Sequence, residues 1–417
     1  MSEGGFFAAG PRARSVRFSA YGHFYSHFAM TAYATIAVAL PQAFPEWSYA
    51  EILELATPAV IVYGLGAPVA GWLADRWSRI GMIAVFLLGV GCAGIACGLA
   101  PGPTSLAVAF AFLGLFGSIY HPVGFAWLSS VSDRPGYAFA INGLFGTGAI
   151  ALAPLATGAM IDMADWRTAS IVPGVAALIC GVALWRAWAG GRLVESGGAA
   201  AATAPTERAE TSRVFAVLAV SIVAGGMIVQ GLPFVLPKLF DDRFADAAAE
   251  IGATLGFGPA TMIGAAVFLV YAIGAMGNFL GGWLADKVSL KWAYVSVWAL
   301  NTSLLGLLAL AFGFSTFFVA AAIAFLNTAA LPVENVLLSR WTPQAWRGRM
   351  FGWKFILAFG VSGLSVPAAA YVYDRYGDFG ALFVAGAAIG LMATTIALLL
   401  PADREPVAPE PAAGPVT

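Results

Sequence analysis

Three histidines, the full complement of the chain, lie in segments that are otherwise apolar. His23 and His27 are four residues apart and therefore share one face of a helix. An imidazole has an unperturbed pKa of about 6.5, so it can carry a proton at cellular pH. We therefore consider His23, His27 and His121 as candidates for moving protons or binding a solute. The alternative for each is a hydrogen bond that only joins two helices.

Polar side chains also interrupt apolar segments in the second half of the chain, namely Gln230, Glu334, Asn335 and Lys354. A charge at the centre of a membrane costs about 2.5–3.5 kcal/mol on insertion scales, so such residues usually serve a function. A Glu334 carboxyl group that lost its water near a histidine could hold or pass a proton. The alternative for Glu334 is an interfacial salt bridge with Arg340 or Lys354. For Lys354 we expect a side chain that extends to the membrane surface, with a functional role as the alternative.

The composition indicates what must hold these residues in place. The chain is 60% hydrophobic and 10% charged, whereas soluble domains have about 25% charged residues. A net charge of −1 offers no basic face for nucleic acid. Three cysteines lie in apolar stretches without metal-binding spacing, so we expect neither disulfides nor a metal centre. Arginines precede the first apolar stretch, but no cleavable signal follows, and we expect a retained first helix of a multi-pass membrane protein.

Membrane-spanning helices need about 20 mostly apolar residues, and twelve such segments follow one another. The first six cover 18–44, 50–73, 79–100, 104–131, 137–162 and 167–189. The last six cover 213–239, 259–284, 289–313, 315–340, 350–374 and 378–401. We expect an N-terminal segment at 1–17, a six-helix bundle at 18–189, a linker at 190–212, a second six-helix bundle at 213–401 and a disordered tail at 402–417.

The basic residues predict the orientation. With both termini and the linker in the cytoplasm, sixteen lysines and arginines fall on the cytoplasmic side and four on the external side, in line with the positive-inside rule. The cytoplasmic set is Arg12, Arg14, Arg17, Arg76, Arg79, Arg134, Arg186, Arg192, Arg208, Arg213, Lys287, Lys291, Arg340, Arg347, Arg349 and Arg404. The external set is Arg167, Lys238, Arg243 and Arg375. In this topology an acidic external loop follows the segment 213–239 and contains Asp241, Asp242, Asp246 and Glu250.

A five-residue sequence occurs once in each half, as Gly71-Trp72-Leu73-Ala74-Asp75 and as Gly282-Trp283-Leu284-Ala285-Asp286. A repeat of this period indicates a duplicated membrane bundle. An aspartate at a helix boundary can accept hydrogen bonds from the N-terminus of a neighbouring helix, and an arginine can bind a carboxylate. The motif therefore predicts a cytoplasmic gate that breaks when the two halves rock; the alternative is that its charges are merely interfacial. The gate residues are Gly71, Asp75, Arg76, Arg79, Gly282, Asp286 and Lys287.

The first copy, Gly71-Trp72-Leu73-Ala74-Asp75-Arg76-Trp77-Ser78-Arg79, resembles the loop motif of the major facilitator superfamily, and the likeness extends over roughly residues 18–401. The resemblance implies two pseudo-symmetric six-helix bundles, with the first, fourth, seventh and tenth helices lining a central cavity. A second likeness is local. The segment Gly117-Ser118-Ile119-Tyr120-His121-Pro122 is similar to the His-Pro helix of the fosmidomycin-resistance-like members, a drug-efflux branch of the superfamily. Residues 107–116 lack the arginine that exporters of the superfamily often carry, which puts standard drug–proton antiport in doubt.

We expect an all-α, proton-linked secondary transporter of the bacterial inner membrane. It is expected to move a small organic solute by alternating access, and we favour export as the direction. The solute is expected between the halves near the mid-membrane, in contact with His27, Tyr120, His121, Gln230 and Glu334. The alternative is a symporter that takes up a small organic anion with protons. The sequence contains no residue pattern that supports a sensor or an intramembrane enzyme. We expect a monomer in the lipid bilayer without cofactor, metal or nucleic acid.

Overall fold

The computed structural model describes residues 6–401 apart from residue 8, segments 132–134, 196–207, 342–349 and 351–352, and residue 355. The predicted tail at 402–417 and most of the predicted linker lie outside the described residues, as do Arg134, Arg347, Arg349 and Arg404. Every regular element in the described part of the chain is a helix, which agrees with the predicted all-α fold.

The helices fall into two consecutive series. The first series is α1 (Pro11–Ala43), α2 (Tyr49–Glu54), α3 (Thr57–Leu65), α4 (Ala67–Arg76), α5 (Arg79–Leu99), α6 (Pro103–Gly117), α7 (Tyr120–Val131), α8 (Pro135–Met163) and α9 (Trp166–Ala189). The second series is α10 (Arg208–Leu255), α11 (Pro259–Lys287), α12 (Leu290–Leu310), α13 (Phe314–Trp341), the π-helix η1 (Ile356–Val361), the 3-10 helix η2 (Ser362–Leu364), α15 (Ser365–Tyr376) and α16 (Gly380–Ala397).

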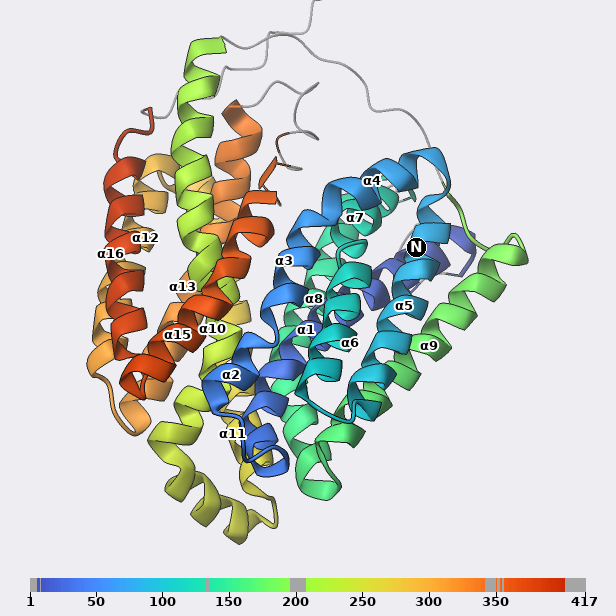
Figure 1. Ribbon diagram of the computed structural model, residues 1–417. Helices are drawn as coiled ribbons and strands as arrows, with labels where there is room; N and C mark the ends of the chain where they lie inside the picture. The colour runs from blue at the N-terminus through green and yellow to red at the C-terminus, as the bar shows by residue number, and fades with distance from the viewer. Residues whose placement is uncertain are drawn as a thin grey trace, which may run out of the picture.

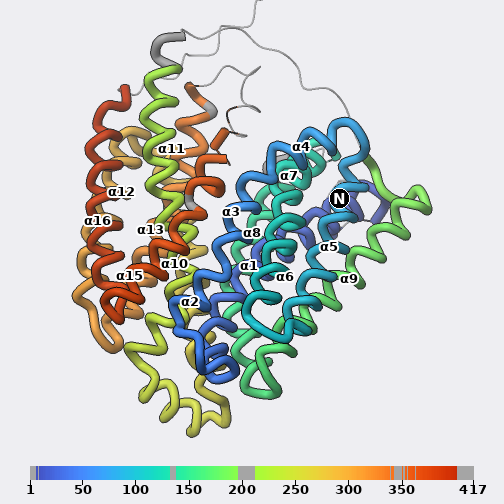
Figure 2. The backbone as a smooth tube through the Cα atoms, in the orientation of Figure 1, coloured from blue at the N-terminus to red at the C-terminus, as the bar shows by residue number. Residues whose placement is uncertain are grey.

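Each series packs into its own bundle (Figures 1 and 2). In the first bundle α5 packs against α6 and α9, and α1 packs against α7 and α8. In the second bundle α11 packs against α13, and α12 packs against α13 and α16. The two bundles meet where α8 contacts α11, α2 contacts α15, α1 contacts α10 and α3 contacts η1. The fold is therefore a duplicated six-helix arrangement with an interface made by a few helices from each half.

Ten spans in the described residues are long and apolar enough to cross a membrane, if α6 with α7 and η1 with η2 and α15 each count as one. The bent pair formed by α2–α3 and α4, with an angle of 42° between its parts, makes an eleventh span. The 33-residue α1 is also long enough, although its apolar character is weaker. Its polar side chains Ser15, Ser19, His23 and Ser26 are buried inside the protein. A helix surrounded by other helices does not need an apolar surface all round, so α1 completes the twelve crossings.

Corresponding helices in the two halves begin with the same cap. The Ser78 hydroxyl accepts a hydrogen bond from the backbone N–H of Gly81 at 2.9 Å, at the start of α5. The Ser289 hydroxyl accepts one from Trp292 at 3.5 Å, at the start of α12. Both serines stand three residues after the end of the repeated five-residue motif, and a serine is a favoured N-cap residue. The duplication is therefore visible in local hydrogen bonds as well as in the sequence.

The helix predicted at 213–239 is longer than expected, and the prediction of an acidic loop after it is wrong. The α10 helix starts at Arg208 and continues to Leu255 with a break in helical geometry at Phe244. Nζ of Lys238 lies 2.8 Å from Oδ2 of Asp241 and 2.7 Å from Oδ1 of Asp242. These ion pairs, three and four residues apart, neutralise part of the acidic stretch and stabilise the helix.

The segment predicted as one helix at 350–374 is also different in the structure. Within its described part, a π-helix and a 3-10 helix precede α15. The backbone of Gly360 in η1 packs directly against Gly64 of α3, and a Cβ atom on Gly64 would clash with it. A π-helix is a less regular arrangement that often occurs at functional sites. This irregular segment lies at the interface between the two bundles.

The two ends of the molecule differ in how the bundles are joined. We call the end with the α4–α5 connection and residues 192–195 the linker end, at the top of Figure 1, and the opposite one the far end. At the far end, Asp162 of α8 accepts hydrogen bonds from the backbone N–H and the hydroxyl of Thr261 in α11, both at 2.6 Å. Gly158 and Gly264 allow the same two helices to pack backbone against backbone. The far end is therefore closed.

Candidate functional site

A small cavity lies between the two bundles. It has a volume of about 50 Å³ and is lined by residues of α1, α3 and α8 on one side and of α10, η1, η2 and α15 on the other. Its polar lining is Ser26, His27, Thr31, Tyr63, Gln230 and Ser365. This volume accommodates a few water molecules, because one water needs at least about 10–15 Å³ on this scale. A solute would therefore need the bundles to move apart.

The three histidines converge beside this cavity. The ring centroids of His23 and His27 are 5.0 Å apart, those of His27 and His121 are 5.1 Å apart, and those of His23 and His121 are 5.4 Å apart. His23 and His121 are buried, whereas His27 is partly exposed and lines the cavity. The structure thus brings together the three residues that the sequence singles out, from α1 and from the first turn of α7.

Hydrogen bonds hold two of these rings in place. Nδ1 of His23 lies 2.7 Å from the backbone carbonyl oxygen of Asn142 in α8. A carbonyl oxygen can only accept, so His23 donates from Nδ1 and its Nε2 bears the lone pair. Nδ1 of His121 lies 3.0 Å from the hydroxyl of Tyr63. Gly146 leaves the space that the His23 ring fills, since a Cβ atom there would clash with it.

Tyr120 supports the cluster from behind and does not line the cavity. Its hydroxyl donates to the Ser19 carbonyl oxygen at 2.8 Å and accepts from the amide of Asn142 at 2.8 Å. Its ring stacks on His23 with a centroid distance of 5.2 Å. The predicted solute contact of Tyr120 is therefore not available in this conformation. Ser19 and Asn142 were absent from the predicted site, although each is a polar residue in an apolar segment.

An aromatic residue of the second bundle touches the histidine cluster. Phe359 of η1 lies 4.8 Å from the His121 ring and 5.9 Å from the Tyr63 ring, measured between centroids. Gln230 of α10 lines the same cavity as His27, as the sequence predicts for a shared site. The cluster therefore belongs to the first bundle, and the irregular helix η1 links it to the second.

Glu334 and Lys354 form a separate charged cluster in the second bundle. Nζ of Lys354 lies 2.7 Å from Oε1 of Glu334 and donates to Oδ1 of Asn335 at 2.5 Å. The Tyr294 hydroxyl donates to Oε2 of Glu334 at 2.9 Å. The side chains of both ion-pair partners are 8% exposed. The prediction that Lys354 reaches the membrane surface is therefore wrong, and the salt bridge with Glu334 is buried.

Among the described residues, no ion pair joins the first copy of the gate motif to the second. The Asp75 side chain is 68% exposed, and the ion pair that it forms in the described part of the chain is with Arg79 of the same copy, at 3.4 Å. The Arg76 guanidinium lies 4.1 Å from the centroid of the Trp72 ring. Against the described residues, a Cβ atom would meet an ordinary van der Waals contact at Gly71 and open space at Gly282. Among the described residues, Asp286 and Lys287 form no ion pair.

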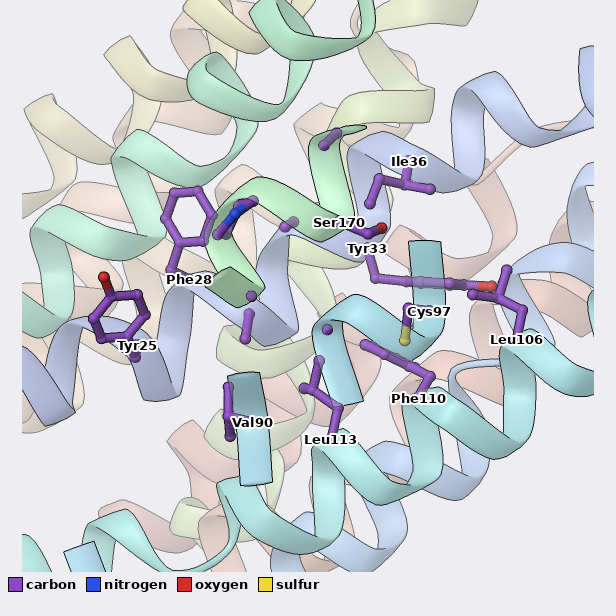
Figure 3. Close-up of a pocket in the computed structure, with 16 residues that line it drawn as sticks. Tyr25, Phe28, Tyr33, Ile36, Val90, Cys97, Leu106, Phe110, Leu113 and Ser170 are labelled. Atoms are coloured by element: carbon purple, nitrogen blue, oxygen red, sulfur yellow. The ribbon is translucent and has the colours of Figure 1, made fainter. Parts of the chain in front are cut away.

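A further cavity of about 40 Å³ lies inside the first bundle, and none of the three histidines is among its lining residues (Figure 3). It is lined by Phe28 and Tyr33 of α1, Val90 of α5, and Phe110 and Leu113 of α6, among other mostly apolar side chains. The Tyr33 hydroxyl already donates to the Ile52 carbonyl oxygen at 2.6 Å. With few polar groups and no part of the second bundle in its wall, this cavity does not fit a site between alternating halves.

The sequence profile described as Major Facilitator Superfamily matches residues 23–269 and 244–416. The chain belongs to the major facilitator superfamily. The repeated motif, the two bundles and the central cavity are therefore those of a member of this transporter superfamily, which also confirms that the protein is not an enzyme.

Known proteins similar to this superfamily member fall into two groups. A curated relative, the puromycin resistance protein pur8 of Streptomyces alboniger, is 31% identical over 126 residues, which are 30% of this chain and 25% of the relative. The match thus spans about a quarter of that relative's length.

Solved structures match the whole chain. A bacterial homolog to the human lysosomal transporter Spinster, in an inward-facing and occupied conformation, has a TM-score of 0.71 at 15% identity and covers 93% of this chain and 94% of its own. A POT family transporter in complex with 5-aminolevulinic acid has a TM-score of 0.72 at 12% identity, with 96% and 97% covered. A D-xylose-proton symporter has a TM-score of 0.67 at 14% identity, with 93% and 96% covered. At these identities the likeness concerns the fold of the superfamily.

Proposed function

We propose that this transporter moves a small organic solute through the cavity between the bundles and couples that movement to protons. The observation that carries the proposal is the shared lining of this cavity by His27, Tyr63 and Gln230, with two more imidazoles directly behind it. Imidazoles can gain and lose a proton at cellular pH. Binding sites between the repeats of secondary transporters are the usual location for both solute and coupling ion.

The difference between the two ends supports alternating access. At the far end the Asp162–Thr261 hydrogen bonds and the Tyr49–Tyr373 ring contact, with centroids 5.0 Å apart, join the bundles. At the linker end the charged gate residues Asp75, Arg76, Asp286 and Lys287 are exposed, and no ion pair among the described residues joins the two copies of the motif. With the linker in the cytoplasm, as the basic residues predict, this conformation is inward-facing. Closing the linker end would bring the two copies of the motif together and lock them.

The buried ion pair supports a route for coupling. Protonating Glu334 removes the charge that compensates Lys354, and an uncompensated buried charge is strongly unfavourable. Lys354 lies shortly before η1, whose Phe359 touches His121 and Tyr63. A rearrangement of η1 can therefore transmit a protonation event at Glu334 to the histidine cluster and the cavity.

The direction we propose is export. The puromycin resistance relative is consistent with it, although the match covers only part of both chains. The alternative, uptake of an organic anion with protons, is favoured by the histidine-rich interior and by the missing arginine at 107–116. It would use Lys354 as a counter-charge for the anion, but Lys354 already has a counter-charge in Glu334. A positively charged or neutral solute would not need Lys354 as a counter-charge.

Transport into energised vesicles tests this proposal. Export predicts that inside-out vesicles with an acidic interior accumulate the solute, starting with puromycin as a probe and continuing with a panel of small organic cations and anions. His121→Ala and Glu334→Gln should each abolish the response to the proton gradient, while Cys92→Ala should behave as the parent. Accumulation of an anion driven by an inward proton gradient in right-side-out vesicles would instead establish the alternative, and full proton-driven flux in both variants would exclude the proposed proton route.

A further inference from the structure

The arrangement of the histidines has a property that proton coupling does not require. One nitrogen from each of His23, His27 and His121 can be chosen so that all three atoms lie within 4.8 Å of one another. Three imidazole ligands of a tetrahedral zinc ion, at about 2.0–2.1 Å from the metal, are about 3.3 Å apart. Small side-chain rotations therefore suffice to place all three on one ion. We propose that His23, His27 and His121 form a binding site for a divalent transition-metal ion of the zinc class.

The backbone presents these ligands in a suitable pattern. His23 and His27 lie at positions i and i+4 of α1, a spacing that lets two imidazoles on one helical face bind the same metal ion. The third ligand comes from the first turn of α7, a helix that packs against α1. Gly146 of α8 leaves room for the edge of the His23 ring that carries its two nitrogens. Two consecutive turns of α1 and the first turn of α7 therefore bring their three histidines together.

Hydrogen bonds around the cluster match the surroundings of metal-binding histidines. Such histidines almost always use their second ring nitrogen to donate to a carbonyl, a carboxylate or water, which fixes the ring and raises its basicity. His23 donates from Nδ1 to the Asn142 carbonyl and keeps the lone pair of Nε2 for a ligand bond. The Tyr63 hydroxyl lies 3.0 Å from Nδ1 of His121 and can accept from it in the same way. Two of the three rings already have this outer support.

The donor set selects the kind of metal. Imidazole nitrogens suit zinc, copper and nickel, whereas magnesium and calcium need oxygen ligands. The cluster supplies three nitrogens, and His27 lines the cavity between the bundles. The fourth coordination position therefore opens toward that cavity, as in zinc sites that bind water or a substrate. A metal ion held there would be accessible to a ligand that enters between the halves.

Metal binding by the full-length protein tests the site without any knowledge of the solute. Because the cluster uses every histidine of the chain, the protein must carry an affinity tag without histidines. After removal of metal with a chelator, titration with Zn²⁺ should give one ion per chain. X-ray absorption should show a shell of nitrogen or oxygen at about 2.0 Å with imidazole features and no sulfur. The absence of stoichiometric binding, or a sulfur shell, would overturn the proposal.

Matched variants assign the ligands. His27→Ala and His121→Ala should each weaken Zn²⁺ binding by more than the roughly 10–100-fold loss typical of an outer hydrogen-bond partner. Tyr63→Phe should weaken Zn²⁺ binding by about 10–100-fold and leave the imidazole features of the X-ray absorption spectrum unchanged. A variant with Cys92, Cys97 and Cys180 all replaced by alanine should bind as tightly as the parent. If the histidine variants elute as intact protein and still bind Zn²⁺ equally well, the three histidines are not the ligands.

The same preparations separate this site from the proposed transport. Proton-driven solute flux in chelator-treated vesicles would support the transport function whether or not zinc binds. Zinc binding to a protein that moves no solute would support the metal site alone.

Discussion

The two polar clusters of the molecule hold buried groups in opposite ways. In the first bundle, three imidazoles are held by ring packing and by neutral partners such as the Asn142 carbonyl and the Tyr63 hydroxyl. In the second bundle, two opposite charges compensate each other at 2.7 Å, and neutral side chains complete their hydrogen bonds. The first cluster can therefore accept a proton or a cation without first breaking an ion pair, whereas any change at the second alters a compensated charge.

This difference predicts unequal consequences for substitutions of similar size. Breaking a buried ion pair leaves a charge without a partner, and the cost is about 3–5 kcal/mol. Losing a neutral buried hydrogen bond costs about 1–3 kcal/mol when a polar group stays unsatisfied. The following four substitutions span this range from the largest effect to the smallest.

Lys354→Met should produce the largest loss of stability, about 3–5 kcal/mol, because Glu334 then remains buried without a counter-charge. The double variant Glu334→Leu with Lys354→Met should recover most of this loss. Thermal unfolding of the purified protein measures both, with Lys291→Met on the partly exposed start of α12 as the control. A double variant no more stable than the single one would mean that the charges are not coupled.

Asn142→Leu should destabilise the protein by about 1–3 kcal/mol, since the Tyr120 and Ser19 hydroxyls lose the amide that donates to them. The leucine has a similar size, so little of the effect should come from an empty space. Unfolding experiments measure the loss, and tryptophan fluorescence checks that the fold persists. If Asn142→Leu lowered the free energy of unfolding as much as Lys354→Met does, the predicted difference between the neutral and the charged cluster would be wrong.

Tyr63→Phe should cost about 0.5–1.5 kcal/mol, the net value of one hydrogen bond, here the bond to His121. The control is Tyr33→Phe, which removes a buried hydroxyl bond to the Ile52 carbonyl far from the histidines. Both variants should lose similar stability, but only Tyr63→Phe should change the pH dependence of solute flux. If solute flux had the same pH dependence in both variants, Tyr63 would not take part in the proposed proton pathway.

Asp75→Asn should have the smallest effect on stability, at most about 1 kcal/mol, because its pairing with Arg79 is exposed. Its effect on transport should be larger than its effect on stability if the gate forms when the linker end closes. Thermal unfolding and flux measured on the same preparation compare the two. An unchanged transport rate would leave Asp75 as an interfacial charge.

Much of the fold followed from the sequence because apolar length and internal repetition are strong signals. The segments at 79–100 and 167–189 agree closely with α5 and α9. The extension of α10 was missed because its acidic residues resembled a loop, whereas Lys238 pairs with two of them inside the helix. Irregular helices such as η1 depend on close contacts with another element, and hydrophobicity carries no information about those.

The candidate site was only partly predictable for a geometric reason. Successive residues of a helix point about 100° apart, so Tyr120 and His121 could not both face the cavity, and the structure places only His121 beside it. Glu334 was expected near the histidines, but sequence alone gives its depth and not its direction around the helix. Asn142 could have been found, because it is a lone amide in the apolar segment 137–162.

The contact between Gly64 and Gly360 has a mechanical consequence. Two backbones that touch without side chains have no interlocking surfaces to separate, so one can roll over the other with little resistance. This contact lies next to the Tyr63–Phe359 ring pair, where α3 and η1 join the two bundles. It therefore has the properties of a fulcrum: a slight tilt about these two glycines would open one end of the molecule by the same motion that shuts the other.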